Sequence, residues 1–87
     1  MAFSISLEKK VIRSDLPAMP TASKEQVMRA IYERLTVDPL SFGKPLRHSL
    51  SGMRSLRVGD YRVGYVVEGD NVIIKHIEHR RDAYKGW

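Results

Sequence analysis

The residues of this chain best suited to chemistry are cations in its second half. Arg57, Arg62 and Lys75 fall in a stretch that alternates apolar and polar residues, and a polar C-terminus follows with His79, Arg80, Arg81 and Tyr84. Guanidinium groups match phosphate oxygens with paired hydrogen bonds and stay charged throughout a reaction. A histidine near neutral pH can act as an acid or a base. These residue types predict an anionic partner or substrate.

Other catalytic patterns are missing from the sequence. The chain has no cysteine, so it has neither a disulfide nor a thiolate metal site. It contains no glycine-rich phosphate loop, no serine nucleophile elbow and no pair of acids spaced for carboxylate catalysis. His48 and His76 lack partners at metal-ligand spacing. We therefore expect no metal and no cofactor.

The pattern from Arg54 onward predicts two hairpins whose strands have unlike faces. A two-residue loop at Gly59-Asp60 places Arg57 opposite Arg62, and a turn at 68–71 places Arg62 opposite Ile77. One face is apolar, carries the core and also holds His76: Leu56, Val58, Tyr61, Val63, Tyr65, Val67, Val72 and Ile74. The other face carries three cations and no acid within its strands: Arg57, Arg62, Gly64, Val66, Ile73, Lys75 and Ile77, with His79 at its end.

Two arginines directly opposite one another in a sheet are destabilising by up to about 1 kcal/mol. This cost favours an anion bound between Arg57 and Arg62. The alternative is that the two side chains splay into solvent, or pair with Glu78 or Asp82. Both interpretations remain open from the residues alone.

Charge and length set the broad class. The 87 residues carry a net charge of +5, and their length predicts one domain spanning residues 1–87. Residues 1–43 hold six basic and five acidic side chains, whereas residues 44–87 hold nine basic and five acidic ones. A basic half indicates nucleic acid or an acidic protein as partner. No signal peptide or membrane span is predicted, so we expect a cytoplasmic protein.

The predicted elements follow the order βααβββ. A strand over 3–7 alternates apolar residues with serines, and a helix over 8–15 ends before Pro17. A second helix starts at Thr21 or Ser23, with a capping box between Ser23 and Gln26, and ends near Asp38. Residues 39–52 form a connector, and the hairpins follow. We expect an α+β fold in which two N-terminal helices pack on an antiparallel β-sheet.

Two segments carry a resemblance to a known family. The string Leu56-Arg57-Val58-Gly59-Asp60-Tyr61-Arg62-Val63-Gly64-Tyr65, followed by His79-Arg80-Arg81-Asp82-Ala83-Tyr84, resembles the RelE/ParE superfamily of toxins from type II toxin–antitoxin systems. The resemblance covers nearly the whole chain and implies a RelE-like fold. It also implies a cognate antitoxin as the binding partner, and the basic face predicts that this antitoxin is acidic.

The resemblance to RelE-like members implies a ribosome-dependent, metal-independent mRNA endoribonuclease that inhibits translation. Such toxins enter the ribosomal A site, where the 2′-hydroxyl of the mRNA attacks the adjacent phosphate. By resemblance, Arg62 stabilises that phosphate with help from Arg80 or Arg81, and Tyr84 stacks on a base or transfers a proton. The implied substrate-binding residues are Arg57, Arg81, His79, Lys75 and Arg54.

One position departs from the family pattern. RelE-like nucleases commonly have a second basic residue where this chain has Ser55, and the nearest cation is Arg54, which alternation places on the apolar face. Either Arg54 reaches the other face through a bulge, or the site has one cation fewer. A ParE-type toxin, which inhibits DNA gyrase by binding without nuclease activity, is the alternative function, because one fold hosts both.

Overall fold

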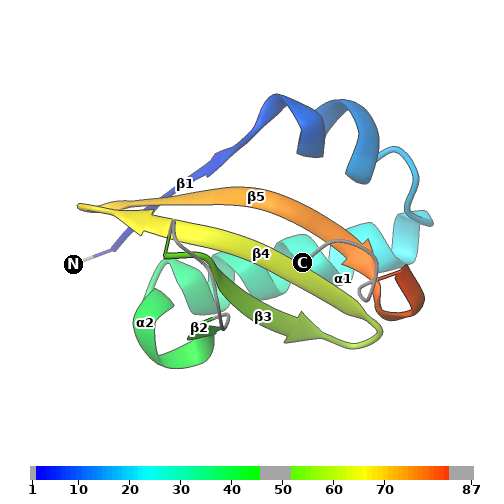
Figure 1. Cartoon of the computed structure of the whole chain (residues 1–87). Helices are drawn as coiled ribbons and strands as arrows, with labels where there is room; N and C mark the ends of the chain where they lie inside the picture. The colour runs from blue at the N-terminus through cyan, green and yellow to red at the C-terminus, as the bar shows by residue number, and fades with distance from the viewer. Residues whose placement is uncertain (1, 46–51, 83–87) are drawn as a thin grey trace.

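The structure is a computed structural model that describes residues 2–45 and 52–82. Its elements are, in order, β1 (Ser4–Leu7), η1 (Val11–Asp15), α1 (Thr21–Ala30), η2 (Ile31–Leu35), α2 (Pro39–Phe42), β2 (Lys44–Pro45), β3 (Arg54–Val58), β4 (Tyr61–Glu68), β5 (Asn71–His79) and η3 (Arg80–Asp82). Within these ranges five strands form one sheet in the order β1-β5-β4-β3-β2, and α1 lies behind it in Figure 1. The predicted α+β class is confirmed.

The N-terminal strand makes the sheet mixed. β1 pairs with β5 in parallel, with Ser4 opposite Asn71 and Leu7 opposite Ile74. The ladders that join β2, β3, β4 and β5 are antiparallel. A parallel pair needs a long crossover, which the helices between β1 and the hairpins provide. The prediction of an antiparallel sheet is therefore correct for the hairpins and wrong for β1.

The first helical segment covers the edge of β5 beyond the end of β1. η1 is wound as a π-helix, in which the Leu16 N–H donates to the Val11 carbonyl at 2.9 Å. The Asp15 Oδ2 atom accepts a hydrogen bond from the Ile77 N–H at 3.0 Å. Because an unpaired strand edge is prone to pair with other chains, this carboxylate substitutes for a neighbouring strand.

The second predicted helix is present, but it starts differently. α1 begins at Thr21, directly after Pro20, and no side chain caps its first turn. The capping box expected from Ser23 and Gln26 is therefore wrong. The ring of Pro20 fixes its own φ at −57°, and Pro20 is the residue directly before the first helical turn. The helix continues from α1 into η2.

The predicted connector contains a short helix and a strand that sequence periodicity missed. Asp38 caps α2, because its side chain accepts a hydrogen bond from the Ser41 N–H at 3.3 Å. The buried Tyr65 hydroxyl donates to the Pro39 carbonyl at 2.5 Å. β2 then pairs with β3, placing Pro45 opposite Arg54. Contacts from the sheet thus define this segment, which is too short to show a period of its own.

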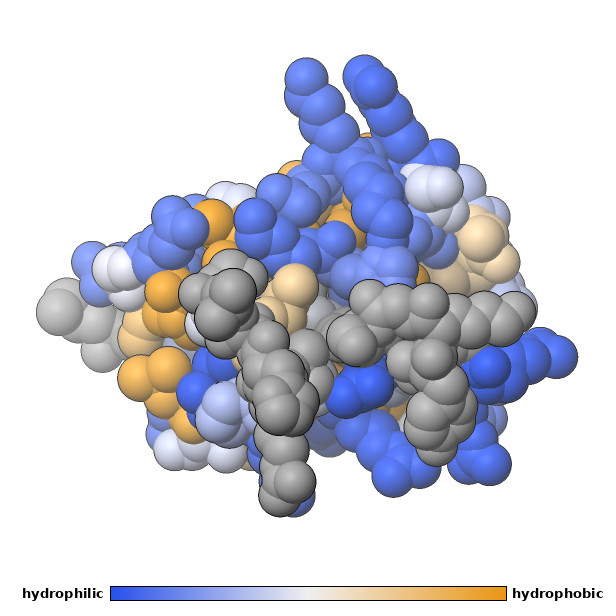
Figure 2. Space-filling model, viewed as in Figure 1, coloured by the Kyte–Doolittle hydropathy of each residue, from blue (hydrophilic) through white to orange (hydrophobic). Residues whose placement is uncertain are grey.

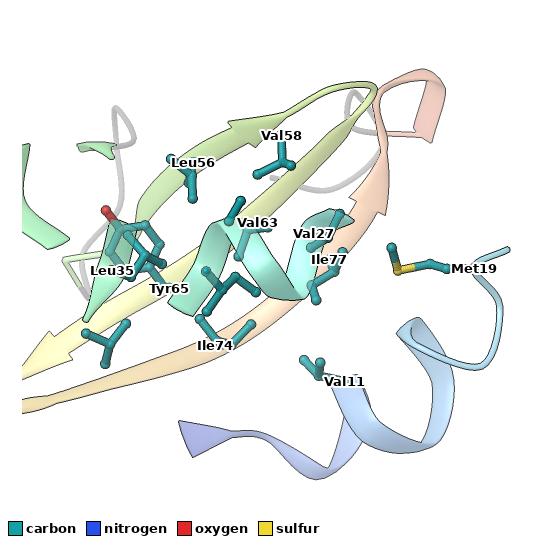
Figure 3. Close-up of a cluster of buried hydrophobic side chains, with 13 residues drawn as sticks. Val11, Met19, Val27, Leu35, Leu56, Val58, Val63, Tyr65, Ile74 and Ile77 are labelled. Carbon is teal, nitrogen blue, oxygen red and sulfur yellow. The ribbon is translucent and has the colours of Figure 1, made fainter. Parts of the chain in front are cut away.

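The core lies between the sheet and the helices. Val63, Tyr65, Val72 and Ile74 are fully buried on the face toward α1, as predicted. Figure 3 shows side chains from η1, α1 and the strands pointing toward one another. The buried cluster consists of Val11, Met19, Val27, Ala30, Ile31, Leu35, Leu56, Val58, Val63, Tyr65, Val72, Ile74 and Ile77.

A bulge in β5 changes the predicted faces. The ladder follows the predicted register from Glu68 opposite Asn71 to Tyr65 opposite Ile74, but Gly64 pairs with His76, so Lys75 has no partner in the ladder. One extra residue moves every later side chain to the other face. Ile77 is consequently a core residue, 3% exposed, and His76 leaves the apolar face. The predictions for both residues are wrong.

Candidate functional site

Two arginines lie side by side on the sheet face that points away from α1, which we call the open face. Arg57 on β3 and Arg62 on β4 are register partners, as the two-residue loop predicts. Gly59 opens that loop with φ of 57°, in the left-handed region that glycine adopts readily. Leu56, Val58 and Val63 beside them are buried in the core, so alternation directs both arginines to the open face.

Arg80 lies at the same end of the sheet. Its N–H donates to the Asp60 carbonyl at 2.7 Å, and its Nη1 is 3.8 Å from the Asp60 Oδ1 atom. These contacts hold Arg80 beside the loop that joins β3 to β4, two residues before Arg62. The side chains of Arg80 and Asp60 are 65% and 67% exposed, so their long ion pair contributes little stability. The Arg80 guanidinium thus remains accessible to a ligand.

His79 lies on the other side of the sheet from Arg62. It pairs with Tyr61 across the ladder, and the two rings meet edge to face with centroids 5.2 Å apart. Its Nδ1 atom accepts a hydrogen bond from the Arg81 N–H at 3.2 Å. The prediction that His79 ends the cationic face is wrong, because the bulge moves it to the face of Tyr61.

The bulge brings an acid and a histidine onto the open face, where the sequence predicted only cations. Glu78 is the register partner of Arg62. The His76 Nε2 atom lies 2.9 Å from the Glu78 Oε2 atom, and the Glu78 side chain is 15% exposed. The other carboxylate oxygen, Oε1, is buried without a hydrogen-bond partner. Sequence alternation could not find this pair, because nothing in the residue pattern marks Lys75 as the bulged position.

A charged network connects this pair to η1. The His76 Nδ1 atom contacts the Lys10 amino group and lies 3.5 Å from the Asp15 Oδ2 atom. Lys10 is also 2.9 Å from that Asp15 atom. His76 is thus held from both ring nitrogens, and its ring orientation is set by its neighbours.

Two of the predicted substrate-binding cations are engaged elsewhere. The Lys75 amino group is 3.0 Å from the Glu8 carboxylate, at the edge of the sheet. The Arg54 guanidinium donates to the carbonyls of Leu40 at 2.6 Å and Gly43 at 2.8 Å. Arg54 therefore braces α2 from the core side and does not reach the open face through a bulge. Ser55 leaves the open face with one cation fewer than the family pattern.

Tyr65 also contacts α2, and its surroundings change the pKa of its hydroxyl. Burial raises the pKa of the Tyr65 hydroxyl above its ordinary value of 10.0, while the hydrogen bond and charge of Arg54 act against the rise. Tyr65 is fully buried and its hydroxyl is bonded to Pro39. We assign it to the structure of the fold and not to chemistry.

Figure 2 shows where hydrophilic and hydrophobic residues gather on the side of the molecule that is viewed there. In Figure 2 hydrophilic residues predominate around the grey segments, and hydrophobic residues gather at the end of the molecule where the N-terminus lies.

Tyr84, the predicted aromatic member of the site, lies outside the described residues. Among the residues that the structure describes, no group of three or more histidine or acidic side chains is arranged to hold a metal ion. In the same ranges, no helix has the length and apolar character needed to cross a membrane.

Comparison with known proteins identifies the family. A family model described as the ParE toxin of the type II toxin–antitoxin system parDE matches residues 10–84. The toxin RelG of Mycobacterium tuberculosis is 36% identical over 75 residues, which cover 84% of this chain and 86% of RelG. The chain belongs to the RelE/ParE superfamily of type II toxins.

Solved structures of this superfamily share the fold of the toxin. A chain of the RelBE2 toxin–antitoxin complex from M. tuberculosis has a TM-score of 0.84 and 31% identity, with 94% of this toxin and 95% of that chain covered. A mutant of the Escherichia coli toxin RelE in the free state has a TM-score of 0.73 at 18% identity, covering 97% and 90%. The second likeness concerns the fold alone. Because the matches include both ParE and RelE names, the function of this toxin depends on its site.

Proposed function

We propose that this toxin is a ribosome-dependent endoribonuclease that cleaves mRNA and so inhibits translation. The observation that supports the proposal is that Arg57 and Arg62 are register partners on the open face, with Arg80 bonded to Asp60 in the loop that joins their strands. Guanidinium groups at one end of the sheet suit a phosphate that gains negative charge during a reaction. A purely structural role gives no reason to place two arginines opposite each other.

The proposed reaction uses groups of the RNA and of the protein. The 2′-oxygen of a ribose forms a bond to the adjacent phosphorus, and the bond from phosphorus to the 5′-oxygen breaks. The products are a 2′,3′-cyclic phosphate and a 5′-hydroxyl, which takes its proton from water. Arg62 stabilises the charge on the phosphate oxygens, and Arg57 and Arg80 bind the same strand. Guanidinium groups supply the positive charge in this scheme, so it requires no metal ion.

Glu78 is our candidate for the group that takes the proton of the 2′-hydroxyl. It lies opposite Arg62 in the ladder, and His76 orients its Oε2 atom. The buried Oε1 atom has no partner, and an acceptor left in that condition costs free energy unless a donor reaches it. The Glu78 side chain as a whole is 15% exposed, so we propose that a substrate hydroxyl approaches the carboxylate from the open face. This assignment gives the site the general base that the sequence alone did not provide.

The remaining residues and the partner follow from the superfamily. Arg81 follows Arg80 in η3 and extends the basic surface, and Tyr84 is proposed to stack on a base or assist proton transfer. RelE toxins from M. tuberculosis and two archaea have been solved as complexes with RelB antitoxins. We propose a cognate antitoxin for this toxin too. With a net charge of +5 on the toxin, an acidic antitoxin segment over the open face would neutralise the site.

Primer extension on a reporter mRNA tests the proposal. The toxin is induced in growing cells, and the reporter is supplied both with and without a functional start codon. We expect cuts in phase with codons, only on the translated message. Growth arrest with intact mRNA would reject the nuclease.

The match to the ParE family model favours one second candidate, inhibition of DNA gyrase by binding. This function needs no convergence of arginines around a phosphate. A supercoiling assay with purified gyrase and toxin discriminates the two. Loss of supercoiling activity, together with intact mRNA, supports the ParE-type function.

A further inference from the structure

We infer that a groove between η1 and the end of β5 binds a nucleobase of the RNA strand, next to the proposed cleavage site. The inference rests on the proposed function and adds a second contact between toxin and RNA. The groove has a volume of about 740 Å³ and lies between the η1–α1 connector and the ends of β4 and β5. Pockets of about 300–1,000 Å³ are typical of sites for small ligands, and a nucleotide falls in that class.

The groove has the apolar and aromatic surfaces that a base requires. Ala18, Met19 and Pro20 line one side, and Tyr61 and His79 line the other. The two rings meet edge to face with centroids 5.2 Å apart, so they form one aromatic wall. Single-stranded RNA is commonly recognised through bases that stack on tyrosine and histidine rings. A phosphate alone would have no use for this lining.

The polar groups of the groove suit a base that carries an exocyclic amino group. Asp15, whose side chain is 10% exposed, is among the residues that line the groove. Its position is fixed, because its Oδ2 atom accepts from the Ile77 N–H and contacts Lys10. Aspartate and glutamate accept hydrogen bonds from the amino group of cytosine, whereas a uracil presents a carbonyl oxygen at the same place. We therefore expect cytosine to bind better than uracil.

The groove is continuous with the proposed cleavage site. Arg81 lines it and directly follows Arg80, which lies beside the loop before Arg62. A strand whose phosphate is bound at the arginines on the open face would pass Arg81 at the end of β5. The base of a neighbouring nucleotide would then enter the groove, while Arg81 contacts its phosphate.

NMR titration of the toxin tests the inference without ribosomes or cleavage. The probes are CMP, UMP and ribose 5-phosphate, and the signals followed are the Ala18 methyl group and the rings of Tyr61 and His79. We expect saturable shifts with CMP and about tenfold weaker binding of UMP, which corresponds to about 1.4 kcal/mol. Ribose 5-phosphate should leave the rings unshifted. Equal shifts with all three probes would reject a base site.

Two matched substitutions localise the binding. Ala18 lines the groove, whereas Ala22 is exposed on α1 and does not line it. Ala18→Trp should fill the groove and weaken CMP binding at least tenfold, and Ala22→Trp should leave it unchanged. If Ala18→Trp does not fold, the wild-type shift map still decides the question. Groove shifts that appear only with an acidic antitoxin peptide, and not with CMP, would overturn the inference in favour of a protein ligand.

The two proposals fail separately. CMP binding in the groove of a toxin that leaves mRNA intact would reject the nuclease and retain the base site. Codon-phased cleavage by a toxin that shows no CMP shifts would retain the nuclease and reject the groove.

Discussion

Arg62 on β4 lies opposite Glu78 on β5, because the bulge at Lys75 shifts the second half of β5 by one residue. Without the bulge, Arg62 would face Ile77, and the open face would carry no acid. The shift therefore changes a uniformly cationic surface into a site with both a cation and a carboxylate. Such a pair can hold a phosphate and accept a proton within one step, which a cluster of arginines alone cannot do.

Glu78→Gln should remove most of the nuclease activity and leave the fold intact. The amide keeps the size of the side chain and cannot take a proton from the 2′-hydroxyl. Loss of a general base typically lowers the rate by about 100- to 10,000-fold. Single-turnover cleavage on programmed ribosomes measures the effect. Glu68→Gln is the matched control, because Glu68 is exposed at the far end of β4, and equal rates in both variants would remove Glu78 from the mechanism.

Arg62→Ala and Arg80→Ala should each abolish growth arrest without unfolding the protein. Arg62 contributes positive charge at the proposed phosphate position, and Arg80 is largely exposed. Growth curves after induction measure the loss, and circular dichroism of the purified variants confirms the fold. Arg13→Ala removes an exposed arginine of η1 that does not line the groove, and this variant should remain toxic. Folded, fully toxic Arg62 and Arg80 variants would show that the proposed site is wrong.

The hairpins were predictable from the sequence, and the bulge was not. Gly59-Asp60 between alternating strands determined the Arg57–Arg62 register, because a two-residue loop leaves one pairing. The second turn was equally clear, and the ladder follows it as far as Tyr65 opposite Ile74. Beyond that point the residue pattern of β5 fits either register. His76 and Glu78 suit the polar face at least as well as Lys75 and Ile77 do.

The sequence did not predict α2, and the physical reason differs from that for the bulge. Its four residues are too few to show a helical period, and the contacts that hold it come from Arg54 and Tyr65 in the sheet. Long-range hydrogen bonds of this kind leave no local signal. The same contacts explain why Arg54, which the family pattern made a candidate for substrate binding, has a structural role.

Arg54→Lys should destabilise the fold without affecting the proposed chemistry. The guanidinium reaches the carbonyls of Leu40 and Gly43 together, and a lysine cannot reproduce that fork. Loss of one hydrogen bond from a charged donor costs about 1.5–3 kcal/mol. Urea denaturation measures the change in the free energy of unfolding. The cleavage rate of the folded variant should match that of wild type. A variant that is as stable as wild type but cleaves much more slowly would show that Arg54 binds the substrate.

The stability of the toxin should fall above pH 10 because of Tyr65. Burial raises the pKa of this hydroxyl in the folded state above the value of 10.0 that it has in the unfolded chain. As pH rises past that value, the unfolded chain releases the proton first, so the unfolded state is favoured. The stabilisation is therefore complete below pH 10 and is lost as pH approaches the raised pKa of the folded state.

Tyr65→Phe separates this contribution from other alkaline effects. At neutral pH the variant should be less stable by about 1–2 kcal/mol, because the Pro39 carbonyl loses the hydrogen bond from the tyrosine hydroxyl. Above pH 10 it has no hydroxyl to ionise at this position, so its free energy of unfolding should decline less steeply than that of wild type. Urea denaturation from pH 7 to 11 should show the two curves converging. Parallel curves would mean that Tyr65 ionises equally easily in the folded and unfolded states, which is inconsistent with a buried hydroxyl bonded to a backbone carbonyl.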